Sequence, residues 1–170
     1  TTLVAAREFD ENRHMLMITK QGIIKKVALS AFKNMRRSGL IAVNLLPGDE
    51  LVGAVRVVKG DVVMVNTARG QAIMFEEEQV RPMGRTATGV KGISLDPGNY
   101  VIGIDKYRQG ADVLIVTEHG YGKRVPLEEF KTQNRGGKGV KSIELTHKNG
   151  EVVASKIVSE EDELVILTSE

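Results

Sequence analysis

Three basic segments of the sequence contain the residue types best suited to binding chemistry. They read KNMRRSG at 33–39, RPMGRTATG at 81–89 and KTQNRGGKG at 131–139, and none contains an acidic residue. Lysine and arginine attract phosphate groups, and glycine allows backbone N–H groups to approach an anion closely. One such segment alone is most simply a solvated loop. Three at the same repeat position predict a row of cations along one edge, suited to a polyanion that follows that edge.

Double-stranded DNA is the polyanion that fits best. Aromatic residues make up only 4% of the chain, and Phe32, Phe75 and Phe130 fall where core residues are expected, so the stacking platforms of single-strand binders are missing. No segment resembles a recognition helix for the major groove. The remaining way to recognise a duplex is through contacts with the DNA backbone, with preference set by how easily the DNA bends. The predicted DNA-binding residues are Lys25, Lys26, Arg36, Arg37, Arg81, Arg85, Lys91, Lys123, Arg124, Arg135, Lys138 and Lys141.

Other motifs with chemical potential are weaker, and we predict no catalytic site, metal site or cofactor. Gly84 and Gly89 have the glycine spacing of a phosphate loop, but Val90 stands where lysine is required and no helix follows. The histidines His14, His119 and His147 are scattered, cysteine is absent, and no Ser/His/Asp set stands out.

An internal repeat of about 50 residues positions the basic segments. Its glycine and leucine markers recur at intervals of 50, and its threonine marker recurs at intervals of 48, 50 and 51. These markers are Gly39, Gly89 and Gly139, then Leu45, Leu95 and Leu145, and then Thr19, Thr67, Thr117 and Thr168. Markers this numerous define three copies of one structural unit.

Each copy has the pattern of four short strands. In the second copy these are Val52–Val58, Asp61–Thr67, Gln71–Phe75 and Gly89–Leu95, all rich in Val, Ile and Met and bounded by turn residues. Four-stranded units in tandem predict an all-β, propeller-like array of three blades and a partial fourth. We divide it into blades 1–45, 46–95 and 96–145 and a partial blade 146–170.

The two end copies are incomplete. The first starts inside its first strand, and the fourth reaches only Glu151–Val158 and Glu163–Thr168. Because a solitary pair of strands leaves open edges, we expect the last segment to complete or be covered by a neighbouring blade. There is no initiator methionine, and we expect the chain to be part of a larger polypeptide.

Charge and hydropathy exclude some classes of protein. The net charge is only +2, so the distribution of charge carries more information than the total. Acidic residues cluster elsewhere, as at Glu76–Glu78, which we interpret as a solvated strand end. No apolar run approaches the ~18 residues of a membrane span, and no secretory signal is visible. We predict a cytoplasmic location without membrane contact, in keeping with the absence of cysteine.

At Gln133-Asn134-Arg135-Gly136-Gly137-Lys138-Gly139 the sequence resembles the Gln-Arg-Arg-Gly-Gly-Lys-Gly box of the C-terminal domain family of bacterial DNA gyrase A. Further similarity lies in segments 118–124, 80–86, 29–32 and 36–39, so it runs through most of the chain. The box departs from the family at Asn134. In the family the box belongs to the first blade, whereas these copies resemble middle and later blades, so we interpret 133–139 as a degenerate box.

The resemblance implies a β-pinwheel, normally of six blades, whose basic perimeter wraps duplex DNA and directs supercoiling. It implies as partners double-stranded DNA, the rest of gyrase A and the gyrase B protein, in an ATP-dependent type II topoisomerase associated with the bacterial nucleoid. The family's catalytic tyrosine lies in the N-terminal part of gyrase A, so Tyr100, Tyr107 and Tyr121 are not its counterparts. We expect this chain alone to be monomeric and not an enzyme. The alternatives are the equivalent domain of topoisomerase IV and a propeller that binds an acidic protein surface.

Overall fold

A computed structural model of the chain describes residues 4, 9, 12–34, 36 and 38–167. The described part contains strands and three 3-10 turns but no α-helix, so the predicted all-β fold is confirmed. The strands are β1 (His14–Thr19), β2 (Ile23–Ala28), β3 (Leu51–Val57), β4 (Val62–Thr67), β5 (Gln71–Glu76), β6 (Val90–Lys91), β7 (Val101–Lys106), β8 (Asp112–Thr117), β9 (Gly122–Pro126), β10 (Val140–Lys141) and β11 (Val152–Val158). The 3-10 turns are η1 (Leu29–Phe32), η2 (Glu77–Gln79) and η3 (Leu127–Glu129). Among the described residues no helix is long and apolar enough to span a membrane.

A tight hairpin forms the centre of each copy, and the repeated threonine and glycine explain it. In the second hairpin, between β4 and β5, the Gly70 N–H donates to the Thr67 carbonyl at 3.1 Å, and the Thr67 hydroxyl accepts from the Gln71 N–H at 3.1 Å. Gly70 has a φ of +76°, which glycine adopts at little cost. The first hairpin, between β1 and β2, has the same bond from the Gly22 N–H to the Thr19 carbonyl.

The sheets exchange strands between successive copies. Sheet A has the strand order β3-β1-β2-β6, sheet B has β10-β5-β4-β7, and sheet C has β11-β8-β9, all with antiparallel pairing. Sheet A therefore combines the hairpin of the first copy with two outer strands of the second, and sheet B combines the second hairpin with two outer strands of the third. Each sheet is therefore built from strands of two successive copies of the sequence repeat.

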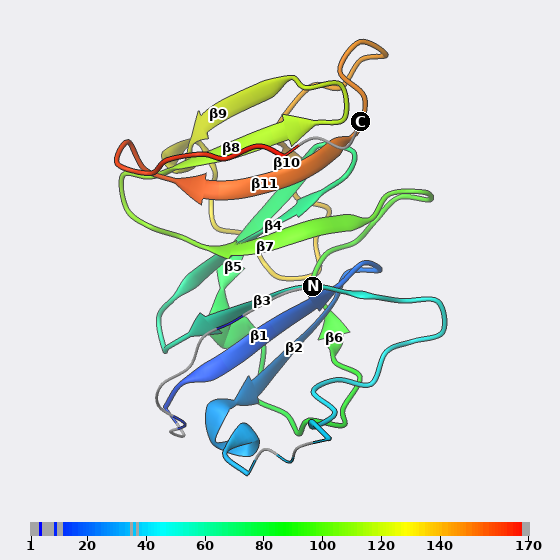
Figure 1. Ribbon diagram of the computed structural model, residues 1–170, viewed down its shortest axis with the longest axis vertical. Coiled ribbons are helices and arrows are strands. Elements are labelled where there is room, and N and C mark those ends of the chain that lie inside the picture. Colours follow the sequence, from blue (N-terminus) through cyan, green and yellow to red (C-terminus); the bar gives the residue numbers. More distant parts are fainter. Residues whose placement is uncertain (1–3, 5–8, 10–11, 35, 37, 168–170) are drawn as a thin grey trace.

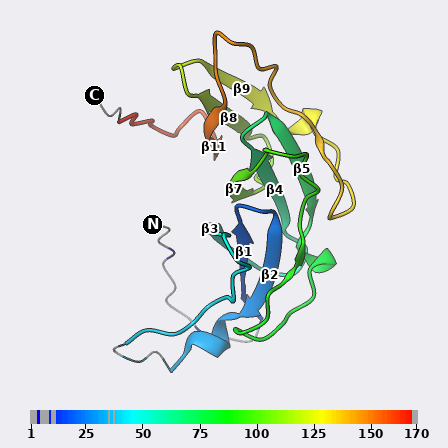
Figure 2. The same ribbon diagram turned by 90° about the vertical axis from the view of Figure 1, so that its right-hand side faces the viewer.

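The three sheets follow one another along an arc (Figures 1 and 2). Strands β3, β7 and β11 lie on its concave side. On its convex side run two crossing segments, which we define as residues 77–91, from β5 of sheet B to β6 of sheet A, and residues 127–141, from β9 of sheet C to β10 of sheet B (Figure 2). These segments contain two of the three predicted basic loops.

Two hydrophobic cores fill the spaces between the sheets. One lies between sheets A and B and includes Leu16, Ile24, Val63 and Phe75, and the other lies between sheets B and C and includes Met64, Val113 and Ile157. Sheet B is buried on both faces, since Val63 and Met64 on β4 belong to different cores. This explains why strands β4 and β5 are almost continuously apolar instead of alternating.

The two predicted strands of the last segment differ in outcome. Strand β11 pairs with β8, so the predicted strand at 151–158 does complete a neighbouring sheet. The second predicted strand, Glu163–Thr168, is wrong over its described residues 163–167, which pair with no strand and leave Leu164 and Leu167 exposed. A strand requires a hydrogen-bonded partner, and apolar sequence alone does not supply one. The predicted first strand of the first copy lies largely outside the described residues.

Candidate nucleic-acid interface

Exposed cations occupy one equivalent position in every copy, just after each 3-10 turn. They are Lys33, Arg81 and Lys131, separated by 48 and 50 residues. All three side chains are exposed, and none makes an ion pair with another described residue. Lys33 and Lys131 were absent from the set predicted from the sequence. Their spacing of 48 and 50 residues from Arg81, the same as that of the repeat, marks them as equivalent positions.

A second exposed position lies on the short outer strands. Lys91 ends β6 and Lys141 ends β10, and both side chains are exposed. Lys141 lies 3.8 Å from Glu144, and Lys138 lies 2.9 Å from Asp96. Both lysines remain 68% exposed in these pairs. Such surface ion pairs stabilise little, so a phosphate can replace the carboxylate at small cost.

The predicted residues in the first basic loop are described only in part. Arg36 is exposed, and its carbonyl accepts from the Gly39 N–H at 2.9 Å, which closes a turn. Arg37 lies outside the described residues. Of this pair, only Arg36 can therefore be assigned to the interface.

Lys25 and Lys26 must be removed from the interface because both are buried. Lys25 is 1% exposed, and its Nζ donates to the carbonyls of Ala42 at 3.1 Å, Ala87 at 2.8 Å and Arg85. Burial, together with the nearby Arg85 guanidinium, lowers the pKa of the Lys25 ammonium. Lys26 Nζ lies 2.5 Å from Glu77 Oε2, and both side chains are buried. Neither ammonium can reach a phosphate.

Lys123 and Arg124 occupy the corresponding positions on β9 and are exposed. Arg124 Nε forms an ion pair with Asp112 on the adjacent strand. Among the described residues no crossing segment pairs with β9, in contrast to β2 and β5, and this explains why the two cations are accessible. They lie on β9, the free edge strand of sheet C, just before the crossing segment that begins at residue 127.

Arg85 and Arg135 are half-buried and bind backbone carbonyls within the protein. Arg85 Nη1 donates to the Ile41 carbonyl at 3.0 Å, and Arg135 Nη1 donates to the Lys91 carbonyl, in both cases 44 residues away along the chain. Arg135 Nε also donates to the Gln79 carbonyl at 3.1 Å. Their first role is to hold a crossing segment against its neighbour.

The degenerate box at 133–139 packs closely into the protein. The Gln133 N–H donates to the Met74 carbonyl at 2.7 Å, and the Gly136 N–H donates to the Gly92 carbonyl at 2.8 Å. A Cβ on Gly139 would lie 2.3 Å from the Ala72 carbonyl oxygen. The expectation that these glycines present N–H groups to phosphate is therefore wrong for Gly136. Backbone-to-backbone packing explains the glycines, while Asn134 and Lys138 are exposed and Gly137 is half-buried.

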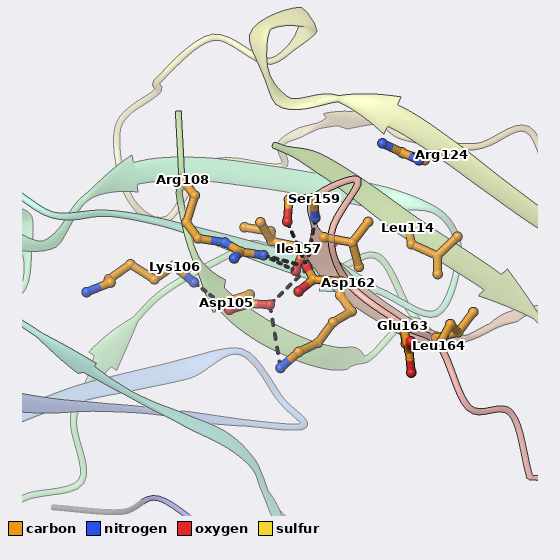
Figure 3. A pocket seen from close by; sticks show the side chains of 12 residues that line it. Asp105, Lys106, Arg108, Leu114, Arg124, Ile157, Ser159, Asp162, Glu163 and Leu164 are labelled. Atoms are coloured by element: carbon orange, nitrogen blue, oxygen red, sulfur yellow. Dashed lines mark hydrogen bonds and ion pairs between the residues drawn. The ribbon is translucent and has the colours of Figure 1, made fainter. Parts of the chain in front are cut away.

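A pocket of about 670 Å³ lies elsewhere, where β7 and β11 meet the turn after β11 (Figure 3). Four of its charged side chains form two ion pairs, Asp162 with Arg108 and Asp105 with Lys156. Asp162 accepts from the Ser159 N–H at 2.8 Å and pairs with Arg108 at 3.1 Å, and these two interactions lower the pKa of the Asp162 carboxyl. Asp105 lies 3.8 Å from Lys156 Nζ. The pocket lies between sheets B and C, and the Ser159 hydroxyl donates to Asp162 at 3.3 Å, a carboxylate that is already paired with Arg108.

Tyrosine and histidine chemistry is not favoured by the described residues. The Tyr100 hydroxyl donates to Glu151 at 3.0 Å; this hydrogen bond, burial and the nearby carboxylates raise the pKa of the phenol. A raised pKa is the wrong direction for a tyrosine nucleophile. The described part of the chain has no group of three or more His, Asp or Glu side chains that could hold a metal ion.

Comparison with known proteins decides the family. The model of the family described as "DNA gyrase C-terminal domain, beta-propeller" matches residues 13–57, 61–107 and 111–159. The chain belongs to this family. Each matched segment runs from the first strand of a hairpin to the outer strand that completes the same sheet, as from β1 to β3. The family unit thus follows the sheets and is shifted relative to the copies defined from the sequence.

Individual relatives agree with this family. The chain is 63% identical over 170 residues to the DNA gyrase A protein of Halalkalibacterium halodurans and 52% identical over 91 residues to that of Clostridium acetobutylicum. These matches cover 99% and 53% of the chain, but only 20% and 11% of the relatives, so the chain spans about a fifth of the first relative. The resemblance found in the sequence is confirmed.

Two solved structures show the same fold. The structure of a DNA gyrase A C-terminal domain superimposes with a TM-score of 0.83 at 29% identity, covering 95% of this chain and 54% of that one. The C-terminal domain of a DNA topoisomerase IV gives a TM-score of 0.84 at 26% identity, covering 91% of this chain and 49% of that one. The propeller-like architecture is confirmed by both.

Proposed function

We propose that this chain is a DNA-wrapping module that binds the phosphate backbone of duplex DNA along the convex side of its arc. The observation that supports this most directly is the recurrence of exposed cations, Arg81 and Lys131, at one position of both crossing segments, with no acidic partner among the described residues. Repeating charges along a curved edge match the phosphates of a duplex bent around that edge. Lys33 occupies the same position in the first copy.

The proposed interface consists of residues that are exposed and either unpaired or in weak surface pairs: Lys33, Arg36, Arg81, Lys91, Lys131, Lys138 and Lys141. It omits the buried Lys25 and Lys26 and assigns Arg85 and Arg135 to holding the crossing segments in place. Lys123 and Arg124 form a separate basic patch at the edge of sheet C.

Backbone recognition of a duplex follows from what the described residues offer. Phe75 and Phe130 are buried, so neither can stack on an exposed base. The described part has no helix to enter a major groove. The module then reads DNA mainly by charge and bendability, and we propose no catalytic step for it.

In the whole protein we propose that this module serves gyrase-type supercoiling. Its partners would be the rest of gyrase A and the gyrase B protein, together an ATP-dependent type II topoisomerase that works on the chromosome in the bacterial cytoplasm. The 63% identity to a gyrase A protein supports gyrase over topoisomerase IV, whose domain is matched at 26%.

Salt dependence of duplex binding tests the proposal. If the seven cations each neutralise one phosphate, the logarithm of the affinity should fall with the logarithm of salt concentration at a slope of about −6. Binding should vary little among duplexes of equal flexibility. Binding to an acidic protein in place of DNA, or duplex binding that does not change between low and moderate salt, would contradict it.

A further inference from the structure

The two junctions between successive sheets use opposite chemistry at one repeated pair of positions. The first position lies on the third strand of each copy and is Lys26, Met74 or Arg124. The second lies in the 3-10 turn of each copy and is Leu29, Glu77 or Leu127. At each junction, the strand residue of one copy meets the turn residue of the next.

At the junction of sheets A and B the pair is ionic. Lys26 Nζ lies 2.5 Å from Glu77 Oε2 and 3.3 Å from the Glu77 carbonyl oxygen. The two side chains are 6% and 3% exposed. The backbones of the two copies are also joined at this junction, because the Met83 N–H donates to the Lys26 carbonyl at 2.8 Å.

At the junction of sheets B and C the pair is apolar. Met74 is 5% exposed and Leu127 is fully buried, and both belong to the core between these two sheets. The backbone contact is nevertheless the same as at the first junction, since the Gln133 N–H donates to the Met74 carbonyl at 2.7 Å. The two junctions therefore share the same backbone hydrogen bond but differ in the chemistry of the side-chain pair.

Each crossing segment is consequently a poor fit for the other hairpin. Leu127 opposite Lys26 would bury an ammonium group without a counter-charge, and Glu77 opposite Met74 would bury a carboxylate. Arrays of similar repeats are prone to misassembly and strand exchange between molecules, because the wrong partner has nearly the right shape. A mismatch of charge is the kind of feature that rejects such a partner.

We propose that the Lys26–Glu77 and Met74–Leu127 pairs specify which crossing segment packs on which hairpin, and so keep the exchange of strands within one molecule and in order. This goes beyond DNA binding, because none of the four residues is in the proposed interface. It assigns the buried acid of the Glu76–Glu78 cluster, expected from the sequence to be solvated, a role in specificity of assembly.

Refolding of junction variants tests the proposal. The variant Lys26→Met/Glu77→Leu gives both junctions the same apolar chemistry. Wild-type chain refolded from urea should be monomeric by size-exclusion chromatography with light scattering. The double variant should give a dimer fraction that rises with protein concentration during refolding, although its urea midpoint is not below that of the wild type. A double variant as monomeric as the wild type would overturn the proposal.

A variant in which the ionic pair and the apolar pair change places shows whether assembly depends on a difference between the junctions or only on an ion pair at the first one. Adding Met74→Lys and Leu127→Glu to the double variant makes the junctions different again, with their order reversed. This quadruple variant should refold as a monomer. If it forms dimers as readily as the double variant, the junction chemistry does not specify assembly.

Mixing experiments provide a measurement if a multiple variant does not fold. The single variants Lys26→Met and Glu77→Leu each lose one half of the ionic pair. Refolded together, they should form a mixed dimer in which Lys26 of one chain meets Glu77 of the other, above the level of either alone. Absence of this excess would also contradict the proposal.

Discussion

Arg135 donates from Nη1 to the carbonyl of Lys91, the residue that ends the outer strand of the neighbouring sheet. Arg85 makes the same bond to Ile41, 3.0 Å away, one repeat earlier. Arginines in the middle of basic loops are easily taken for DNA contacts. Here Arg135 joins one crossing segment to the other, and Arg85 joins a crossing segment to Ile41 of the first copy, so both help to fix where the exposed cations lie.

Replacing Arg135 with lysine should therefore lower stability more than it changes electrostatic binding. Lysine keeps the charge but has a single donor atom, so it cannot reproduce the two separated bonds that Arg135 makes from Nε and Nη1 to the Gln79 and Lys91 carbonyls. We expect the free energy of unfolding to fall by about 1.5–3 kcal/mol, the range for hydrogen bonds to charged groups. Urea unfolding measures this. A variant with wild-type stability and a lower salt slope would instead identify Arg135 as a phosphate contact.

Much of the fold could be predicted from the sequence, because a hairpin is a local structure. Thr67 and Gly70 mark a turn whose two strands pair with each other. Both residues recur at the interval of the repeat, so the turn can be located from the sequence. The exchange of strands was expected only for the last segment and could not be predicted for the earlier copies, because β3 of the second copy pairs with β1 of the first over a long separation that no local signal records. The two-residue strand β6 was also shorter than the expected Gly89–Leu95.

The candidate interface was predicted as a region but not residue by residue. Charge and spacing located the crossing segments. They did not show that Lys25 lies beneath one of these segments while Lys123, at the same position of the repeat, is exposed. Burial depends on which segment covers a strand, and that is decided by the strand exchange.

Removing two equivalent exposed cations should weaken binding to every duplex. For Arg81→Ala/Lys131→Ala we expect the salt slope to decrease in magnitude by about 2, with loss of affinity that does not depend on DNA sequence. Fluorescence anisotropy titrations at several salt concentrations give the slope. The matched control is Lys59→Ala/Lys148→Ala, which removes the same charge from exposed turns outside the crossing segments. Equal losses in the two variants would show that net charge, not position, governs binding.

Gly139 should tolerate alanine much less well than Gly48, although the two have nearly the same φ, +74° and +72°. An added Cβ at Gly139 meets the Ala72 carbonyl oxygen at 2.3 Å, whereas at Gly48 nothing lies within 4 Å. Gly48→Ala should cost about 1–2 kcal/mol for the left-handed conformation. Gly139→Ala should cost about 1–3 kcal/mol more because the crossing segment must move. Similar unfolding midpoints for the two variants would contradict this packing.

The buried ammonium of Lys25 should titrate below an ordinary lysine. Burial, followed by the Arg85 charge, lowers its pKa from 10.5 in the folded protein. Between the lowered pKa and 10.5, the unfolded chain keeps a proton that the folded chain has released. The free energy of unfolding therefore gains a contribution that rises with pH through this window and is absent below it.

Two measurements check the Lys25 titration. The ¹³Cε chemical shift of Lys25 should change at a lower pH than that of a lysine in a model peptide. The pH dependence of urea unfolding in alkaline solution should also be steeper for the wild type than for Lys25→Met, which has no proton to release at this position. The three carbonyls of Ala42, Arg85 and Ala87 oppose the shift by accepting from the charged form. A Lys25 titration at or above 10.5 would mean that these hydrogen bonds outweigh burial.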